Sequence, residues 1–136
     1  MKIYFSGSIT GGREDKELYG EIIALLRQYG SVLTEHVGDK QLGILGQVHL
    51  SPTEVYDKDV SLLKEADVIV AEVTVPSLGV GYEIGFAEAE KKKIVCLYRE
   101  REGKQVSRMI LGNRRNECYR YENTSELSAV FDKLFK

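Results

Sequence analysis

The sequence is poor in the residues that build disulfides and metal sites. It contains two cysteines and two histidines, and neither Cys96 and Cys118 nor His36 and His49 have the spacing of a metal or redox motif. Cys96 lies within IVCLY, a run typical of a buried strand, which favours a packed thiol. This set of side chains does not predict a zinc site. We therefore expect neither a metal nor another cofactor.

Long apolar runs and an excess of one charge are also absent. No stretch approaches the roughly 20 apolar residues of a membrane span, and the opening MKIYFSGSI has too few of them for a signal peptide. With 43% hydrophobic residues, 29% charged residues and a net charge of −2, the composition is that of an ordinary globular protein. It offers no general basic surface for nucleic acid. We expect a cytoplasmic protein that binds neither a membrane nor a nucleic-acid polymer.

What is present is an alternation of short apolar runs with longer helical ones. The length of 136 residues suits one domain spanning 1–136. Strand followed by helix, repeated, is typical of a parallel sheet with crossover helices. The sequence therefore predicts an α/β fold with a doubly wound, five-stranded parallel sheet of flavodoxin-like or Rossmann-like order. The expected strands are 2–5, 31–37, 66–73, 94–100 and 118–122.

Helix signals separate these strands. SPTE has the pattern of a helix start, with Ser51 as N-cap, Pro52 in the first turn and Glu54 completing a capping box. NTSELSAVFDKLF carries an apolar stripe at helical spacing, preceded by Asn123 or Thr124 as a cap. Residues 38–50 have no clear period, and we interpret them as a loop, with a mobile lid as one option.

Two glycine-bearing loops identify the candidate site. SGSITGGR follows the first strand and TVPSLGVGYE follows the third. In a doubly wound sheet, ligands bind beyond the carboxyl ends of the strands where the strand order reverses, here between the first and third strands. The first loop matches neither the P-loop nor the dinucleotide fingerprint. Its glycines and hydroxyls suit either a phosphate site or a flexible polar turn.

Asp59 and Glu83 are the candidate reactive carboxylates. Asp59 falls on the apolar stripe of its helix, so it is either satisfied by local donors or faces a pocket, where it would suit a general acid or base. Glu83 follows Gly81 near a helix start, which suits either the helix dipole or an ionised nucleophile. From its position in the first strand, Tyr4 is interpreted as a core aromatic residue. His36, at the end of the second strand, is a weaker candidate for a site residue.

The motifs resemble those of a known family. YFSGSITGGRED, GSVLTEHV, ADVIVAEVTVPSLGVGYEIG and SRMILG are similar to segments of the 2′-deoxynucleoside 5′-phosphate N-hydrolases, relatives of the nucleoside 2-deoxyribosyltransferases. The resemblance runs from residue 3 to about residue 112. It implies cleavage of the N-glycosidic bond of a deoxynucleoside monophosphate to free base and 2-deoxyribose 5-phosphate, through a covalent glycosyl-glutamate intermediate.

Site residues follow from the same resemblance. It implies Glu83 as the nucleophile, Asp59 as the catalytic aspartate and Tyr4 as an active-site tyrosine. It also implies a homodimer in which Ser107 reaches the phosphate bound by the partner subunit, whereas a local reading makes Ser107 the cap of a short helix. The substrate-binding residues it implies are Gly7, Ser8, Ile9, Gly11, Gly12, Arg13, His36, Ser77, Gly79 and Ser107.

Other functions stay open at this point. The sequence departs from the family at Ser6 and Thr10, where related sequences have cysteine and arginine. Segment 38–56 also matches the family poorly, so the resemblance does not predict which base the protein recognises. A base-exchanging transferase is the alternative enzyme, and a non-catalytic nucleotide-sensing module is the alternative from another class. A phosphoryl-receiver domain is excluded because no acidic pair follows the first strand.

Overall fold

The computed structural model describes residues 1–9, 13–34, 50–101 and 103–136. The expected lid at 38–50 and the end of the expected second strand at 35–37 thus lie almost entirely outside the described residues. The elements run in the order β1 (Lys2–Ser6), α1 (Arg13–Leu26), β2 (Ser31–Val32), α2 (Pro52–Glu65), β3 (Val68–Glu72), α3 (Leu78–Ala89), β4 (Lys93–Tyr98), α4 (Arg108–Gly112), β5 (Asn116–Arg120), the 3₁₀ turn η2 (Thr124–Glu126) and α5 (Leu127–Phe135).

The sheet confirms the predicted class. Its order is β2-β1-β3-β4-β5, and all four pairings are parallel. The first and third strands are neighbours, with Tyr4 opposite Ile69 and Ser6 opposite Ala71. The loops that follow these two strands therefore meet at one edge, as expected. Of residues 31–34, the described part of the expected second strand, Ser31 and Val32 form β2, and the next two residues are in a turn.

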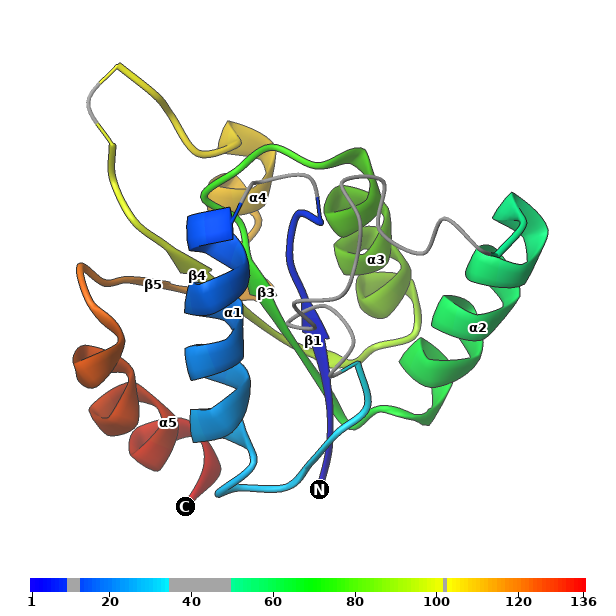
Figure 1. Cartoon of the computed structure of the whole chain (residues 1–136), viewed down its shortest axis with the longest axis horizontal. Helices are drawn as coiled ribbons and strands as arrows, with labels where there is room; N and C mark the ends of the chain where they lie inside the picture. Colours follow the sequence, from blue (N-terminus) through cyan, green and yellow to red (C-terminus); the bar gives the residue numbers. More distant parts are fainter. Residues whose placement is uncertain (10–12, 35–49, 102) are drawn as a thin grey trace.

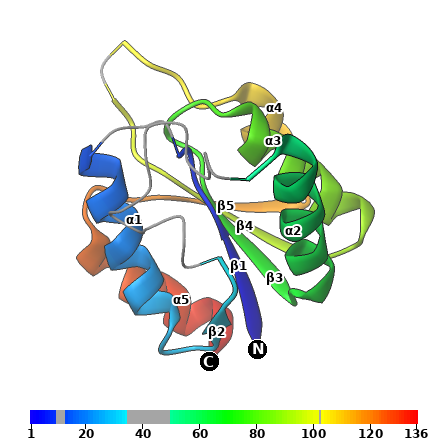
Figure 2. The same ribbon diagram turned by 45° about the vertical axis from the view of Figure 1, so that its right-hand side comes forward.

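Helices cover both faces of the sheet (Figures 1 and 2), with α1 and α5 on one face and α2 and α3 on the other. Because side chains alternate across a strand, each strand contributes to two cores. Ile3 and Phe5 of β1 pack with α1 and α5, whereas Tyr4 between them packs with α2 and α3. All residues of β3 are buried, as a strand covered on both faces requires.

The predicted helix starts are mostly confirmed. The Ser51 hydroxyl accepts from the Glu54 backbone N–H at 3.1 Å, and the Glu54 carboxylate accepts from the Ser51 backbone N–H at 3.3 Å, so the capping box is complete. At the last helix, Asn123 is the N-cap of the 3₁₀ turn, but its side chain makes no capping bond to the backbone, and α5 begins only at Leu127. No helix within the described residues has the length and apolarity needed to cross a membrane.

Candidate active site

A cavity of about 240 Å³ opens at the carboxyl edge of β1, beside α2 and the start of α3. Seven residues singled out from the sequence line it: Tyr4, Gly7, Ile9, Asp59, Ser77, Gly79 and Glu83. The remaining lining residues are Phe5, Ser6, Val55, Tyr56, Val60, Leu63, Val80 and Tyr82. The lining is mostly apolar, and the polar groups come from β1, α2 and α3.

Two hydroxyls from β1 hold the Glu83 carboxylate. The Tyr4 hydroxyl donates to Glu83 Oε2, and the Ser6 hydroxyl donates to Oε1 at 2.9 Å. Tyr4 and Ser6 are two residues apart on a strand, so they face the same side of the sheet, toward α3. Tyr4 is therefore a buried aromatic whose polar end reaches the cavity, and not only a core residue.

Burial raises the pKa of Glu83 to about 8 from its ordinary value of 4.5. The sequence placed Glu83 in the first turn of a helix, where the dipole would keep it ionised. That expectation is wrong, because α3 begins at Leu78 and has no acidic residue in its first turn. Glu83 lies in the second turn, and the dipole effect falls off within the first. The two hydroxyl donors, and not the helix end, favour its charged form.

Asp59 lies on the face of α2 that lines the cavity. It is half-buried, and Val55 and Tyr56 from the preceding turn line the same cavity. Of the two readings that the sequence left open, local satisfaction or a pocket, the cavity lining supports the pocket. The cavity thus combines a carboxyl group from α2 with another from α3.

Ser77 and Gly79 place the start of α3 at the cavity. The Ser77 hydroxyl caps the helix by accepting from the Val80 N–H at 3.2 Å. A hydroxyl oxygen that accepts in this way still has its own proton to donate. Together with the backbone N–H groups of a helix N-terminus, it makes a favourable position for an anion.

Ser107 lies elsewhere, in a neighbouring groove of about 680 Å³. Its hydroxyl caps α4 by accepting from the Ile110 N–H at 3.4 Å, so the local role predicted for it exists. Ser77 and Val80 line both the groove and the cavity with Glu83, so the two hollows adjoin. The described chain alone does not bring Ser107 into the cavity.

The loop after β1 is described only in part. Gly11 and Gly12 lie outside the described residues, and so does the side chain of Arg13, the first residue of α1. His36, at the end of the expected second strand, also lies outside them. Ser8 is buried and does not line the cavity. Its backbone N–H donates to the Tyr19 hydroxyl at 3.2 Å, so this donor is already engaged.

Sequence reasoning missed two features of the cavity. Ser6 was considered only as a hydroxyl of the first loop and as a departure from the family, although its spacing of two from Tyr4 could have indicated that both reach the same carboxylate. Tyr56 and Tyr82 were not singled out. Their rings pack edge to face with centroids 6.3 Å apart, and both are partly exposed where they line the cavity. Their contact joins α2 to α3, and no local pattern predicts it.

Over the described ranges, no three histidine, cysteine, aspartate or glutamate side chains cluster as metal ligands would. The polar groups that line the cavity are hydroxyls and carboxyl groups, which are the groups of acid–base and nucleophilic chemistry, beside a helix N-terminus.

The fold and the sequence were compared with those of known proteins. The fold is similar to that of a CMP N-glycosidase from Clostridium botulinum, with a TM-score of 0.72, 22% identity and coverage of 98% of this chain and 99% of the other. A model of the family described as nucleoside 2-deoxyribosyltransferase matches residues 3–122. The protein belongs to the nucleoside 2-deoxyribosyltransferase family, and the resemblance seen in its motifs is confirmed.

Two relatives narrow the comparison within this family. A human protein named 5-hydroxymethyl-dUMP N-hydrolase is 46% identical over 98% of this chain and 79% of its own length. A Nematostella vectensis protein named putative 2′-deoxynucleoside 5′-phosphate N-hydrolase 1 is 53% identical over 82% of this chain and 76% of its own length.

Proposed function

We propose that the protein is an enzyme that hydrolyses the N-glycosidic bond of 2′-deoxynucleoside 5′-monophosphates, releasing free base and 2-deoxyribose 5-phosphate. One observation carries the proposal: a partly buried glutamate, Glu83, held by the Tyr4 and Ser6 hydroxyls, lines the same cavity as Asp59. The names of the relatives support the reaction class. A cytoplasmic location and independence from cofactors stay predictions from the sequence.

The reaction proceeds in two steps. Glu83, as the carboxylate, attacks the anomeric carbon of deoxyribose while the bond to the base nitrogen breaks and its electron pair leaves with the base. Asp59, in its acid form, gives the leaving base a proton. Asp59 then takes a proton from water, which attacks the glycosyl ester and restores Glu83. This is the logic of a retaining glycosidase, in which a carboxylate traps an oxocarbenium-like transition state.

Tyr4 and Ser6 orient the nucleophile. A carboxylate that accepts one hydrogen bond on each oxygen is fixed in direction, and the bonds stabilise its charge as it approaches the reacting carbon. A pure binding module would have no need of a partly buried acid beside a second carboxyl group, because withdrawing a charge from water costs free energy. This cost favours the enzyme over a nucleotide-sensing module.

The 5′-phosphate is expected to be a required handle. The N-terminus of α3 and the Ser77 hydroxyl border the cavity and offer donors to an anion. Deoxynucleoside monophosphates should be cleaved about 100-fold faster, in kcat/KM, than free deoxynucleosides, the effect of one or two charge-assisted hydrogen bonds. Ribonucleotides should also be poor substrates, because the mostly apolar lining offers little to a 2′-hydroxyl. Chromatography of released bases from a matched panel, including 5-hydroxymethyl-dUMP, measures both ratios.

The same panel tests the alternative enzyme. A second base added to the mixture should leave the products unchanged, because water resolves the intermediate. Equal rates on deoxynucleosides and nucleotides, with exchange of the added base into the sugar, would make the protein a transferase. Release of no base from any member would leave only a binding role.

The site is completed by a second copy of the chain. Leu78 is 97% exposed and Met109 is 86% exposed, although both are large apolar side chains. They line the groove that holds Ser107 and that adjoins the cavity through Ser77. A two-fold dimer formed over this groove would cover these side chains and would bring Ser107 of each chain toward the phosphate held by the other.

Mixing two inactive variants tests this arrangement. Ser107→Glu should repel the phosphate, and Glu83→Ala lacks the nucleophile. Subunit exchange between them should restore about a quarter of wild-type activity per total chain, because half of the dimers are mixed and each has one intact site of two. The matched control mixes Glu83→Ala with Asp59→Asn, which line the same chain's cavity and should show no recovery. If the first mixture recovers no activity although native mass spectrometry shows that the subunits exchange, Ser107 does not act in the site of the partner subunit.

A further inference from the structure

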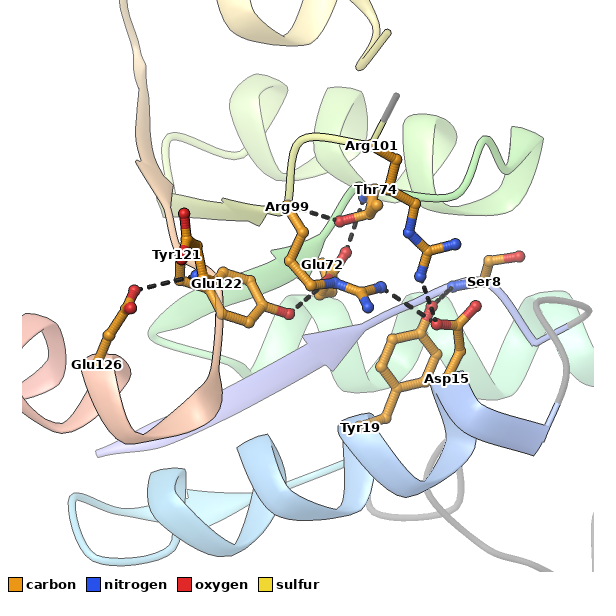
Figure 3. A network of polar contacts seen from close by, with 10 residues as sticks. All are labelled: Ser8, Asp15, Tyr19, Glu72, Thr74, Arg99, Arg101, Tyr121, Glu122 and Glu126. Atoms are coloured by element: carbon orange, nitrogen blue, oxygen red, sulfur yellow. Dashed lines mark hydrogen bonds and ion pairs between the residues drawn. The ribbon is translucent and has the colours of Figure 1, made fainter. Parts of the chain in front are cut away.

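A buried polar network that includes Asp15 of α1 plays no part in the reaction described above (Figure 3). It involves the face of the sheet covered by α1, whereas Glu83 belongs to α3 on the other face. At its centre is Arg99, directly after β4. Its Nε donates to Glu72 Oε2 at 3.2 Å, and its Nη2 donates to Asp15 Oδ1 at 3.1 Å. The Glu72 side chain is fully buried, that of Asp15 is 4% exposed and that of Arg99 is 19% exposed. One guanidinium thus bridges the end of β3 and the first turn of α1.

Further bonds fix the loops around this bridge. Glu72 accepts from the Thr74 N–H at 2.7 Å and also from the Tyr121 hydroxyl. The Thr74 hydroxyl in turn accepts from the Arg99 N–H at 2.9 Å. Arg101 adds a longer contact of 3.4 Å to Asp15. The network therefore connects residues that follow β3, β4 and β5 with the start of α1.

Tyr19, one helical turn after Asp15, carries this connection to the cavity. Its hydroxyl accepts from the Ser8 N–H, and its ring lies so close to Gly7 that an added Cβ would be 2.9 Å away. Burial raises the pKa of the Tyr19 hydroxyl, so it stays neutral. Gly7 itself lines the cavity. The position of the loop residues 7–9 thus depends on where the first turns of α1 are held.

Stability alone is a poor explanation for such a network. Removing two carboxylates and a guanidinium from water costs free energy that their attraction barely offsets, and apolar replacements of similar volume are often at least as stable. What the charges provide is a defined geometry, since a guanidinium offers its donors in a fixed fork. The network lies at the edge of the sheet where the proposed substrate binds.

We propose that Arg99 is a positioning residue that, through Asp15 and Tyr19, holds residues 7–9 in place, so that Gly7 and Ile9 line the cavity beside the start of α3, where the substrate's 5′-phosphate binds. The inference rests on the proposed function. It predicts that loss of the network weakens recognition of the phosphate end and leaves the chemistry at Glu83 nearly unchanged.

The test compares Arg99→Met with the double variant Glu72→Gln/Arg99→Met. The single variant leaves the buried Glu72 without its cation and should lower the melting temperature, whereas the double variant removes both charges and should recover much of it. In both, Asp15 has lost its main partner. We therefore expect KM for a deoxynucleoside monophosphate and the Ki of 2-deoxyribose 5-phosphate to rise about tenfold in both, as for one lost hydrogen bond to an anion. kcat should change less than about threefold.

Two comparisons separate positioning from simple destabilisation. The ratio of kcat/KM for the nucleotide to that for the free deoxynucleoside does not depend on how much enzyme is folded, and it should fall in both variants. Arg120→Met is the control, because Arg120 also faces two acidic side chains but is 53% exposed; it should leave every value unchanged. Recovery of KM, Ki and the ratio together with stability in the double variant would make the network merely structural. A wild-type protein that releases no base would instead overturn the proposed function itself.

Discussion

Replacing Glu83 with alanine or glutamine is expected to reduce base release by on the order of 10⁴-fold or more, the scale of losing a nucleophile. The carboxylate is the group that bonds to the reacting carbon, and neither replacement can form that ester. Nucleotide binding should persist, because Ser77 and the start of α3 are untouched. Single-turnover release of base, with binding measured by calorimetry, gives both values.

Glu90→Gln is the matched control, since Glu90 lies at the exposed end of the same helix. It should keep wild-type activity. Near-normal base release by Glu83→Ala would refute the assignment of the nucleophile.

The pH dependence of stability checks the same carboxyl group independently of activity. The pKa of Glu83 is about 8 in the folded protein against an ordinary value of 4.5, so the folded state holds an extra proton between these values. Its contribution to stability is therefore largest at low pH, falls as pH rises from about 4.5 to about 8 and is constant above that. Glu83→Gln lacks this loss, so its melting temperature relative to wild type should increase across that window. A constant difference from pH 5 to pH 9 would contradict the shifted pKa.

The activity of the enzyme should rise with pH over the range in which the contribution of Glu83 to stability falls. Only the ionised carboxylate attacks, so kcat/KM should increase as Glu83 loses its proton and level off above about pH 8.

Asp59→Asn is expected to lower the rate by roughly 10²–10⁴-fold, the usual range for a positioned acid or base. An amide keeps the shape of the side chain but delivers no proton to the leaving base. The loss should therefore be greatest for bases that leave poorly without protonation and smallest for those that leave readily as anions. Rates measured on a series of deoxynucleoside monophosphates with bases of different acidity give this slope.

Asp57→Asn provides the control, because Asp57 lies two residues away on the exposed part of α2. It should match wild type on every base. A loss that is equal for all bases in Asp59→Asn would mean that Asp59 contributes to binding and not to proton transfer.

Local patterns predicted much of this fold because the signals that carried it are short in range. Helix caps such as Ser51 depend on residues within one turn, and the alternation of strand and helix limits the topology to few arrangements. The two glycine-bearing loops pointed to the edge of the sheet where the cavity with Glu83 opens. The resemblance of the motifs then singled out Glu83, Asp59 and Tyr4, and the structure lines one cavity with all three.

The local errors have physical causes as well. Gly81 suggested a late start for α3, but Ser77 caps the helix earlier, so Glu83 lies beyond the reach of the helix dipole. The second strand was expected to be longer than Ser31–Val32 because its sequence continues in a β-forming pattern. The start of α3 is thus set by a local cap that the sequence analysis did not use, whereas the β-forming composition of the second segment does not decide where β2 ends.

By itself, the sequence determined the fold class, the edge of the sheet that carries the candidate site and the identity of the candidate reactive groups. Only the tertiary structure decided how those groups are held. Tyr4 reaches Glu83 across 79 residues, and Asp15 meets Arg99 across 84. The pKa of Glu83 is raised because β1 and α3 bury it together. Such contacts form only when parallel strands bring distant loops to the same edge, and the periodicity of a single segment contains no information about which neighbour it will meet.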